Sequence, residues 1–121
     1  MLPTSNERHE DAVEELYQEL CFKGREPSAH MLYGPEGHVL GEMDLMTVEM
    51  RNGLTHVTYY EVKTGDSNPR RIARDQARQF YKFFLKIPNV VPRFVYYHPS
   101  DGVEYWRWRD VIYGRQKDRT H

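Results

Sequence analysis

Hydrophobic and polar positions follow two different periods along the chain. Over residues 6–23 apolar residues recur at helical spacing, and a second helical pattern covers 70–87, where Pro69 suits the first turn. Residues 55–64 are rich in β-branched and aromatic side chains, which favours a strand. The full order of expected elements is a helix at 6–23, strands at 29–33, 38–50 and 55–64, a helix at 70–87, and strands at 93–98 and 103–108. This order predicts an α/β fold with a mixed central sheet flanked by helices.

Local signals bound the first expected helix. Ser5 or Asn6 can cap it, and acidic residues fill its first turns. Gly24 can end it, and Pro27 prevents its continuation.

The two expected strands at 38–50 and 55–64 are joined at Asn52-Gly53, the strongest short signal for a hairpin. A two-residue turn of this kind requires positive φ at both positions and places Arg51 opposite Leu54. In this register, the residue numbers of two facing residues always add up to the same value.

This register places Asp44 opposite Glu61 and Glu42 opposite Lys63. Side chains alternate along a strand, so all four would lie on one face of the sheet. A one-residue slip or a bulge would change that geometry. The residues expected on the opposite face, as core, are Met43, Leu45, Tyr60 and Val62.

Two opposed carboxylates on a partly buried surface must share a proton, contact cations or bind a metal. Carboxylate oxygens suit Mg²⁺ or Mn²⁺, and Lys63 could help to offset the charge of Asp44 and Glu61. The alternative is a surface ladder of ion pairs with no ligand. The pattern therefore predicts a metal site and leaves the ion-pair ladder open.

Size and composition set further bounds. The chain has 121 residues, which predicts one domain over 1–121 with a polar tail after about residue 114. Its single cysteine, Cys21, favours a reducing, cytoplasmic setting. We expect no signal peptide and no membrane span, because no apolar stretch approaches the ~18 residues that a span needs. No zinc-ligand, P-loop or nucleophile-elbow spacing occurs.

The net charge of −1 conceals an uneven distribution, acidic near the N-terminus and basic over 70–87. Cations recur every four residues along this second helix, and Arg71 lies beside them. Such a stripe fits a phosphate backbone, although an ordinary solvated face has the same pattern and Asp75 interrupts it. The candidate nucleic-acid contacts are Arg70, Arg71, Arg74, Arg78 and Lys82, and Lys86 continues the stripe.

A glutamine interrupts the apolar side of the same helix. Gln76 shares a face with Ile72, Phe80 and Phe83. On such an apolar face we expect a glutamine to make a specific polar interaction. Gln79 on the neighbouring face is the alternative.

The quoted motifs "GEMDLM" (41–46) and "YEVKTG" (60–65), followed by "RDQARQF" in a helix, resemble the PD-(D/E)XK nuclease superfamily. They look most like the small archaeal and viral Holliday-junction resolvases. The resemblance covers the order of elements from about residue 6 to 97 and implies a restriction-endonuclease-like αβββαβ core. The motifs are short, and their specificity comes from the strand context and the hairpin register.

The resemblance implies a role for each matched residue. Asp44 and Glu61 would ligate Mg²⁺ or Mn²⁺ together with the backbone carbonyl of Val62, and Lys63 would orient or deprotonate the attacking water. Gln76 would contact the catalytic site. Glu10 resembles a glutamate of the first helix that completes the metal shell, with Glu7 and Glu14 as alternatives.

The function implied is a metal-dependent DNA endonuclease, acting on branched DNA and forming a homodimer, because a junction requires two cuts. Two other functions remain open: a non-catalytic nucleic-acid-binding or scaffold module of the same fold, and an exonuclease or RNA-directed nuclease. The aromatic run "YWRW" (105–108) is expected in the core or at a dimer interface rather than stacked on bases.

Overall fold

The computed structural model describes residues 2–65 and 67–114. Its elements, in chain order, are α1 (Ser5–Phe22), β1 (Ser28–Tyr33), β2 (Gly41–Arg51), β3 (Leu54–Val62), α2 (Pro69–Phe84), β4 (Val90–His98), β5 (Gly102–Trp106) and α3 (Trp108–Ile112). Every predicted helix and strand is present, with boundaries that differ by at most three residues. The short helix α3 was not predicted, and the polar tail lies outside the described residues.

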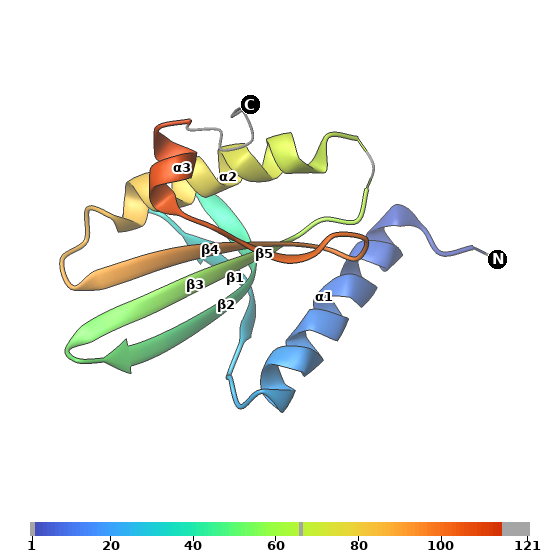
Figure 1. Cartoon of the computed structure of the whole chain (residues 1–121), viewed down its shortest axis with the longest axis horizontal. Helices are drawn as coiled ribbons and strands as arrows, with labels where there is room; N and C mark the ends of the chain where they lie inside the picture. The colour runs from blue at the N-terminus through green and yellow to red at the C-terminus, as the bar shows by residue number, and fades with distance from the viewer. Residues whose placement is uncertain (1, 66, 115–121) are drawn as a thin grey trace, which may run out of the picture.

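The five strands form one sheet in the order β1-β2-β3-β4-β5. The pair β3–β4 is parallel and the other pairs are antiparallel, because α2 carries the chain back across the sheet between β3 and β4. Figure 1 shows α2 and α3 on one side of the sheet and α1 on the other. The predicted α/β class, with a mixed sheet flanked by helices, is confirmed.

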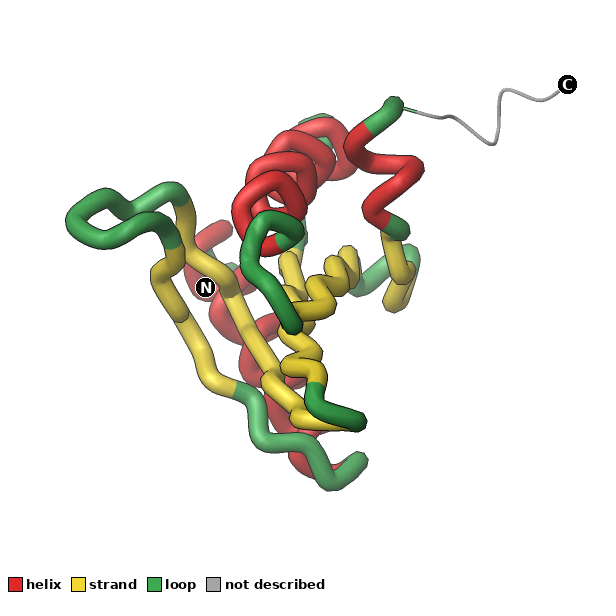
Figure 2. The backbone as a smooth tube through the Cα atoms, turned by 90° about the vertical axis from the view of Figure 1, so that its left-hand side faces the viewer, coloured by secondary structure: helices red, strands yellow, loops and turns green. Residues whose placement is uncertain are grey.

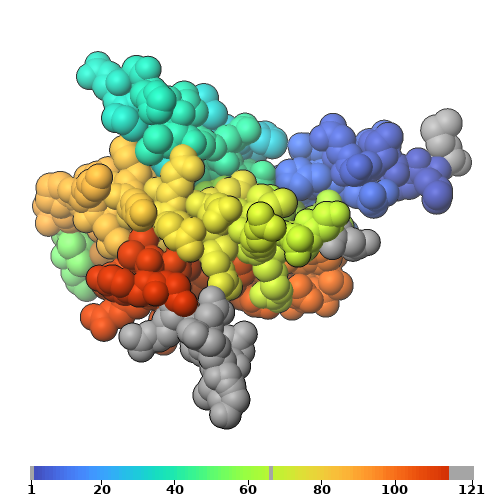
Figure 3. All heavy atoms as spheres, turned by 90° about the horizontal axis from the view of Figure 1, so that it is seen from above, coloured from blue at the N-terminus to red at the C-terminus, as the bar shows by residue number. Residues whose placement is uncertain are grey.

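The other views show how the layers end. Figure 2 shows helices on both sides of the strands when the molecule is turned by 90°. In Figure 3 the cyan segment around the β1–β2 connection projects from the body of the molecule, and the blue helix α1 extends from another end. These two projections come from the N-terminal part of the chain, and the α1 residue His9 lies close to Asp44 of β2.

The predicted hairpin is confirmed. Asn52 and Gly53 have φ of 52° and 79°, as a two-residue turn with two positive φ angles requires. Arg51 faces Leu54, and the same register continues along β2 and β3. The turn chemistry therefore sets which residues of the two strands meet.

Two apolar clusters hold the helices to the sheet. The cluster beneath α2 is mainly aromatic: Phe80 and Phe94 are fully buried, and the Trp106 ring stacks on Tyr96 with 4.9 Å between centroids. Ile72, which the helical period places on the apolar side of α2 with Phe80, is not buried there, because its side chain is 49 % exposed. The separate cluster beneath α1 joins Ala12, Val13, Leu16 and Leu20 to Leu45, Tyr60, Val62 and Val95.

The start of α1 differs from its prediction. Thr4, rather than Ser5 or Asn6, is the N-cap, and it forms a capping box with Glu7. Gly24 follows the helix at a φ of 83°, so it ends α1 as predicted.

Candidate active site

The candidate site lies where β2 and β3 separate. The paired residues of the hairpin extend to Leu45 and Tyr60, and Asp44 and Glu61 are the next residues along. The Asp44 Oδ2 accepts a hydrogen bond of 2.8 Å from the backbone N–H of Val62. The Asp44 carboxylate thus accepts the hydrogen bond that a backbone carbonyl of β2 would accept in a regular sheet. This bond holds Asp44 beside β3.

Glu61 is buried on the α2 side of β3. Its carboxylate accepts a hydrogen bond from the Tyr59 hydroxyl and lies 3.1 Å from Lys63 Nζ. The glutamate side chain is only 4 % exposed, whereas that of Lys63 is 20 % exposed. Lys63 therefore joins a buried carboxylate to the surface of the site.

Both carboxyl groups resist ionisation. Burial raises the pKa of the Glu61 carboxyl, and the nearby Asp44 carboxylate adds to that rise, while Lys63 and Tyr59 oppose it. Burial also raises the pKa of Asp44, against the effects of the Val62 N–H, His9 and Lys63. Burial, and then the nearby Glu61 carboxylate, raises the pKa of Tyr33 to about 12. Two interacting carboxyl groups, one buried and one partly buried, are stabilised in their ionised form only by nearby positive charge.

His9 is the main residue of the site that sequence reasoning missed. Its Nε2 lies 3.1 Å from the carbonyl oxygen of Val62 and 3.4 Å from Asp44 Oδ2. The spacing of His9 from Val13 and Leu16 places it on the inward stripe of α1, so the sequence did contain a signal. The imidazole approaches two of the oxygens that the resemblance assigns to a metal ion.

The structure does not bring Glu10 to the carboxylates. The Glu10 carboxylate is within 3.8 Å of His9 Nδ1 and 3.7 Å of His30 Nε2, so it lies behind the imidazole of His9. Of the two alternatives, Glu7 serves the helix cap and Glu14 accepts a hydrogen bond from Gln18. A role for Glu10 as a direct ligand stays a prediction.

The predicted pairing of Glu42 with Lys63 is wrong. Glu42 lies 3.6 Å from His30 Nδ1, and Lys63 contacts Glu61 instead. His30 has a φ of 56°, and neither it nor Asp44 appears among the paired residues of β1 and β2. The edge of the sheet is therefore distorted beside the candidate site.

The same distortion changes the face to which Met43 belongs. Met43 is buried as predicted, but it packs in the cluster beneath α2, whereas Leu45 packs beneath α1. Side chains two residues apart on a regular strand share a face. The alternation is therefore broken at Asp44, which is why only part of the predicted four-residue face is formed.

The two glutamines of α2 have different surroundings. The Oε1 of Gln76 is buried and has no hydrogen-bond partner among the described residues. Gln79 is exposed and donates a hydrogen bond to the carbonyl oxygen of Leu40. A buried unpaired amide oxygen is unfavourable unless something else uses it, so Gln76 remains the candidate site residue.

The cations along α2 are not equivalent. Arg70 is bound by Glu104, Arg78 pairs with Asp75, and the Arg74 guanidinium lies over the Trp106 ring. Within the described residues no ion pair is formed by Arg71, Lys82 or Lys86. The candidate phosphate-binding stripe is thus partly neutralised at its start and open towards its end.

No protein-family model matches the chain, and no curated protein matches it significantly in sequence. None of the helices in residues 2–65 and 67–114 has the length and apolar character to span a bilayer. Across the same residues, no three side chains of histidine, cysteine, aspartate or glutamate are grouped as a metal centre. The chemistry of the site must therefore be argued from its two carboxylates and their immediate neighbours.

Proposed function

We propose that the chain is a divalent-metal-dependent nuclease that hydrolyses phosphodiester bonds of DNA, on a restriction-endonuclease-like core. The observation that carries the proposal is the close association of Asp44, Glu61 and Lys63 at the separating ends of β2 and β3. A buried carboxyl group beside a partly buried one, both with raised pKa, is unfavourable for folding, and such groups cluster at functional sites. This combination supports a catalytic role over a structural one.

The donor atoms suit a hard divalent cation. The carboxylates of Asp44 and Glu61 and the carbonyl of Val62 would supply oxygen ligands, and Mg²⁺ commonly uses one or two protein carboxylates with water and substrate phosphate. The imidazole of His9 adds a nitrogen donor that Mn²⁺ accepts. Glu10, near its Nδ1, would then orient the ring. When bound, such a cation would acidify a water molecule and offset charge on the phosphate.

The remaining roles belong to the chain itself. The ammonium group of Lys63, held at 3.1 Å by Glu61, can donate to a phosphate oxygen and stabilise the negative charge that develops during hydrolysis. Gln76 provides an unpaired acceptor that would orient a hydrogen of the attacking water. The pKa of Tyr59 is raised by burial and then by Glu61, so its hydroxyl remains a donor that fixes this carboxylate.

The cations of α2 support a polyanionic substrate. Arg71 and Lys82 have no carboxylate partner among the described residues, and the Arg74 guanidinium lies over the Trp106 ring. These side chains would bind backbone phosphates and set the position of the strand without reading its sequence. Preference for branched DNA, internal cleavage and a homodimer are part of the proposal on the basis of the family resemblance alone.

One experiment tests activity, metal requirement and substrate class together. Labelled linear duplex, single strand, RNA and four-way junction are incubated with the protein in Mg²⁺, Mn²⁺ or EDTA. We expect cleavage of DNA in either metal and none in EDTA. Binding without turnover under every condition would instead identify a non-catalytic nucleic-acid-binding module.

The matched variants are Lys63→Ala and Lys23→Ala. Lys63→Ala removes the cation at the site, so we expect cleavage to fall by at least about 10²-fold. Circular dichroism should still show a folded chain, with a lower Tm because the buried Glu61 carboxylate loses its partner. Lys23 pairs with Glu19 at the far end of α1, so its loss should leave cleavage unchanged. Normal cleavage by Lys63→Ala would refute the assigned site.

A further inference from the structure

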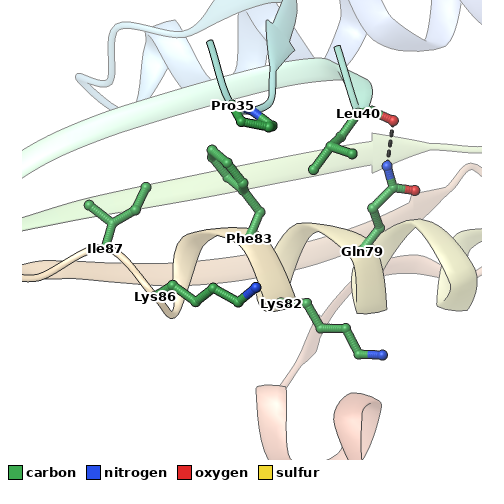
Figure 4. A pocket seen from close by; sticks show the side chains of 7 residues that line it. All are labelled: Pro35, Leu40, Gln79, Lys82, Phe83, Lys86 and Ile87. Carbon is green, nitrogen blue, oxygen red and sulfur yellow. Dashed lines mark hydrogen bonds between the residues drawn. The ribbon is translucent and has the colours of Figure 1, made fainter. Parts of the chain in front are cut away.

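A hollow of about 440 Å³ lies between α2 and the β1–β2 connection. Figure 4 shows Phe83 and Ile87 on one side of it and Pro35 and Leu40 on the other, with the amide of Gln79 bound to the Leu40 carbonyl. Its volume is within the range of small-ligand sites, and its walls are mainly apolar. None of the roles proposed for Asp44, Glu61, Lys63 and Gln76 uses this hollow.

The aromatic wall of the hollow is already held in place. The Phe83 ring contacts the rings of Tyr33 and Phe84, with centroids 5.8 and 4.9 Å apart. Phe83 remains half-buried, and its other surface lines the hollow. A flat, apolar group could therefore enter and stack on a ring that does not have to move.

The edge of the hollow is positively charged. The side chains of Lys82 and Lys86 border it, and neither forms an ion pair among the described residues. Figure 4 shows the Lys82 side chain extending away from the apolar walls and the Lys86 side chain lying along α2 towards Lys82. The occupant that complements this arrangement has an apolar, planar part inside and a negative charge outside, which is the chemistry of a nucleobase attached to a phosphate.

The hollow and the candidate active site are joined by the same segments. Leu40 directly precedes the start of β2, and the Tyr59 hydroxyl donates to the Glu42 carbonyl as well as to Glu61. On α2, Lys82 follows Gln76 by six residues, about 9 Å along the helix axis. That distance is within the length of a few nucleotides, so one strand could reach both places.

We propose that the hollow holds one unpaired nucleobase of a substrate strand whose phosphates lie on Lys82 and Lys86. The inference deepens the proposed nuclease function and rests on it for the identity of the ligand. It makes a strand with unstacked bases the preferred substrate, as at an end, a flap or a branch point. Stacking on Phe83 supplies affinity without sequence preference.

The test measures binding in EDTA, where no cleavage occurs. Fluorescence anisotropy compares a labelled DNA single strand of mixed sequence, its RNA equivalent, and an abasic strand of equal length with the same phosphates. We expect the base-bearing strands to bind about tenfold more tightly than the abasic strand. Similar base dependence for RNA would support the same site, and the two arms show which strand binds better.

Variants separate the two parts of the site. Phe83→Leu should abolish the preference for bases and leave abasic binding unchanged. Ile87→Trp, which fills the hollow from its edge, should do the same if Phe83→Leu does not fold. The double variant Lys82→Ala/Lys86→Ala should lower the affinity for all strands. It should also reduce the slope of log K, the association constant, against log salt concentration by about 1.4. Lys23→Ala is the control and should change nothing.

The inference is overturned if base-bearing and abasic strands bind equally, or if neither Phe83→Leu nor Ile87→Trp changes their ratio. An acidic, phenylalanine-containing peptide that binds the hollow in place of any strand would also overturn it. Base-dependent binding without cleavage in any metal would refute the nuclease and retain this site. Cleavage with no base dependence would refute only this site.

Discussion

Asp44 is placed by a backbone contact that a regular strand would not provide. Its carboxylate accepts the Val62 N–H at 2.8 Å, close to His9 and to the second carboxylate of the site. Burial raises its pKa, so the folded chain binds this proton more tightly than the unfolded chain does. The stability associated with that proton is present below the unfolded pKa and is lost as the pH rises through the folded pKa. At neutral pH the charge on Asp44 therefore destabilises the fold.

Asp44→Asn should raise Tm at pH 7 by about 3 °C, because the amide oxygen can still accept from Val62 while the charge is removed. Adding Mn²⁺ should raise the Tm of the wild type but not that of the variant. Differential scanning calorimetry with and without the metal measures both effects. Asp11→Asn, on the exposed surface of α1, is the control, and a lower Tm for Asp44→Asn would contradict the expectation.

His9 gives a second prediction at this scale. Removing its imidazole with His9→Ala should lower the affinity for Mn²⁺ about tenfold and that for Mg²⁺ less, because imidazole suits Mn²⁺ better. Isothermal titration calorimetry of both ions measures the difference. The exposed His38 supplies a matched control, His38→Ala. Equal affinities in wild type and His9→Ala would show that the ring only packs against the site.

At the scale of elements, the hairpin was the most predictable part of the site. Asn52-Gly53 sets the register of β2 and β3, and that register alone brings Asp44 level with Glu61. The sequence could not predict the distortion at His30 and Asp44, because it arises where β1 and β2 meet and not from either strand by itself. Glu42 and Met43 were assigned to the wrong surroundings for that reason.

The surroundings of two other residues, Ile72 and His9, could not be predicted from the sequence, because they depend on how the elements pack together. Ile72 follows the helical period of α2, but no neighbouring element buries it and its side chain stays 49 % exposed. His9 precedes Glu10 in the acidic first turns of α1, and this pattern is typical of a solvent-exposed helix start. The sequence therefore indicates no partner for the imidazole. Only the position of Val62 beneath α1 gives that imidazole a partner.

The contact between α2 and β5 depends on pH. Arg70 Nη1 donates to Glu104 Oε1 at 2.8 Å, and this hydrogen bond lowers the pKa of the Glu104 carboxyl. A lowered folded pKa stabilises the fold above the unfolded value of about 4.3, and that stability is lost as the pH falls through the folded pKa. The pair is partly exposed, so the effect is small.

Glu104→Gln should therefore lower the free energy of unfolding by about 0.5 kcal/mol at pH 7 and by almost nothing in strongly acidic solution. Urea titrations of wild type and variant at pH 7 and pH 3 measure the two differences. Glu36→Gln, in the exposed β1–β2 connection, is the comparison. A constant difference at both pH values would mean that the side chain acts through packing rather than charge.

At the scale of the whole molecule, the sheet has two outer strands, β1 and β5. Val103 and Tyr105 are more than half exposed on β5, and they pair with Tyr97 and Val95, which belong to the cluster beneath α1. Cutting both strands of a junction requires two copies of the site related by symmetry. The proposed function therefore predicts a homodimer.

Sedimentation equilibrium should give about twice the mass of the 14.5 kDa chain if junctions are the substrate. Tyr105→Glu, on the outer strand, should shift the equilibrium towards the monomer if that strand forms the interface. Tyr113→Glu is a control for adding charge at an exposed tyrosine. A monomer at all concentrations, with full activity on single strands, would remove junction resolution from the proposal.

The separate apolar cluster beneath α1 has a consequence for heat resistance. His9 reaches Val62 and Asp44 only while this helix is docked, and four small or aliphatic side chains do most of the docking. The aromatic layer under α2 takes no part in that attachment. Warming should then detach the N-terminal helix while the sheet stays intact, so loss of catalysis would begin at a lower temperature than loss of strand structure.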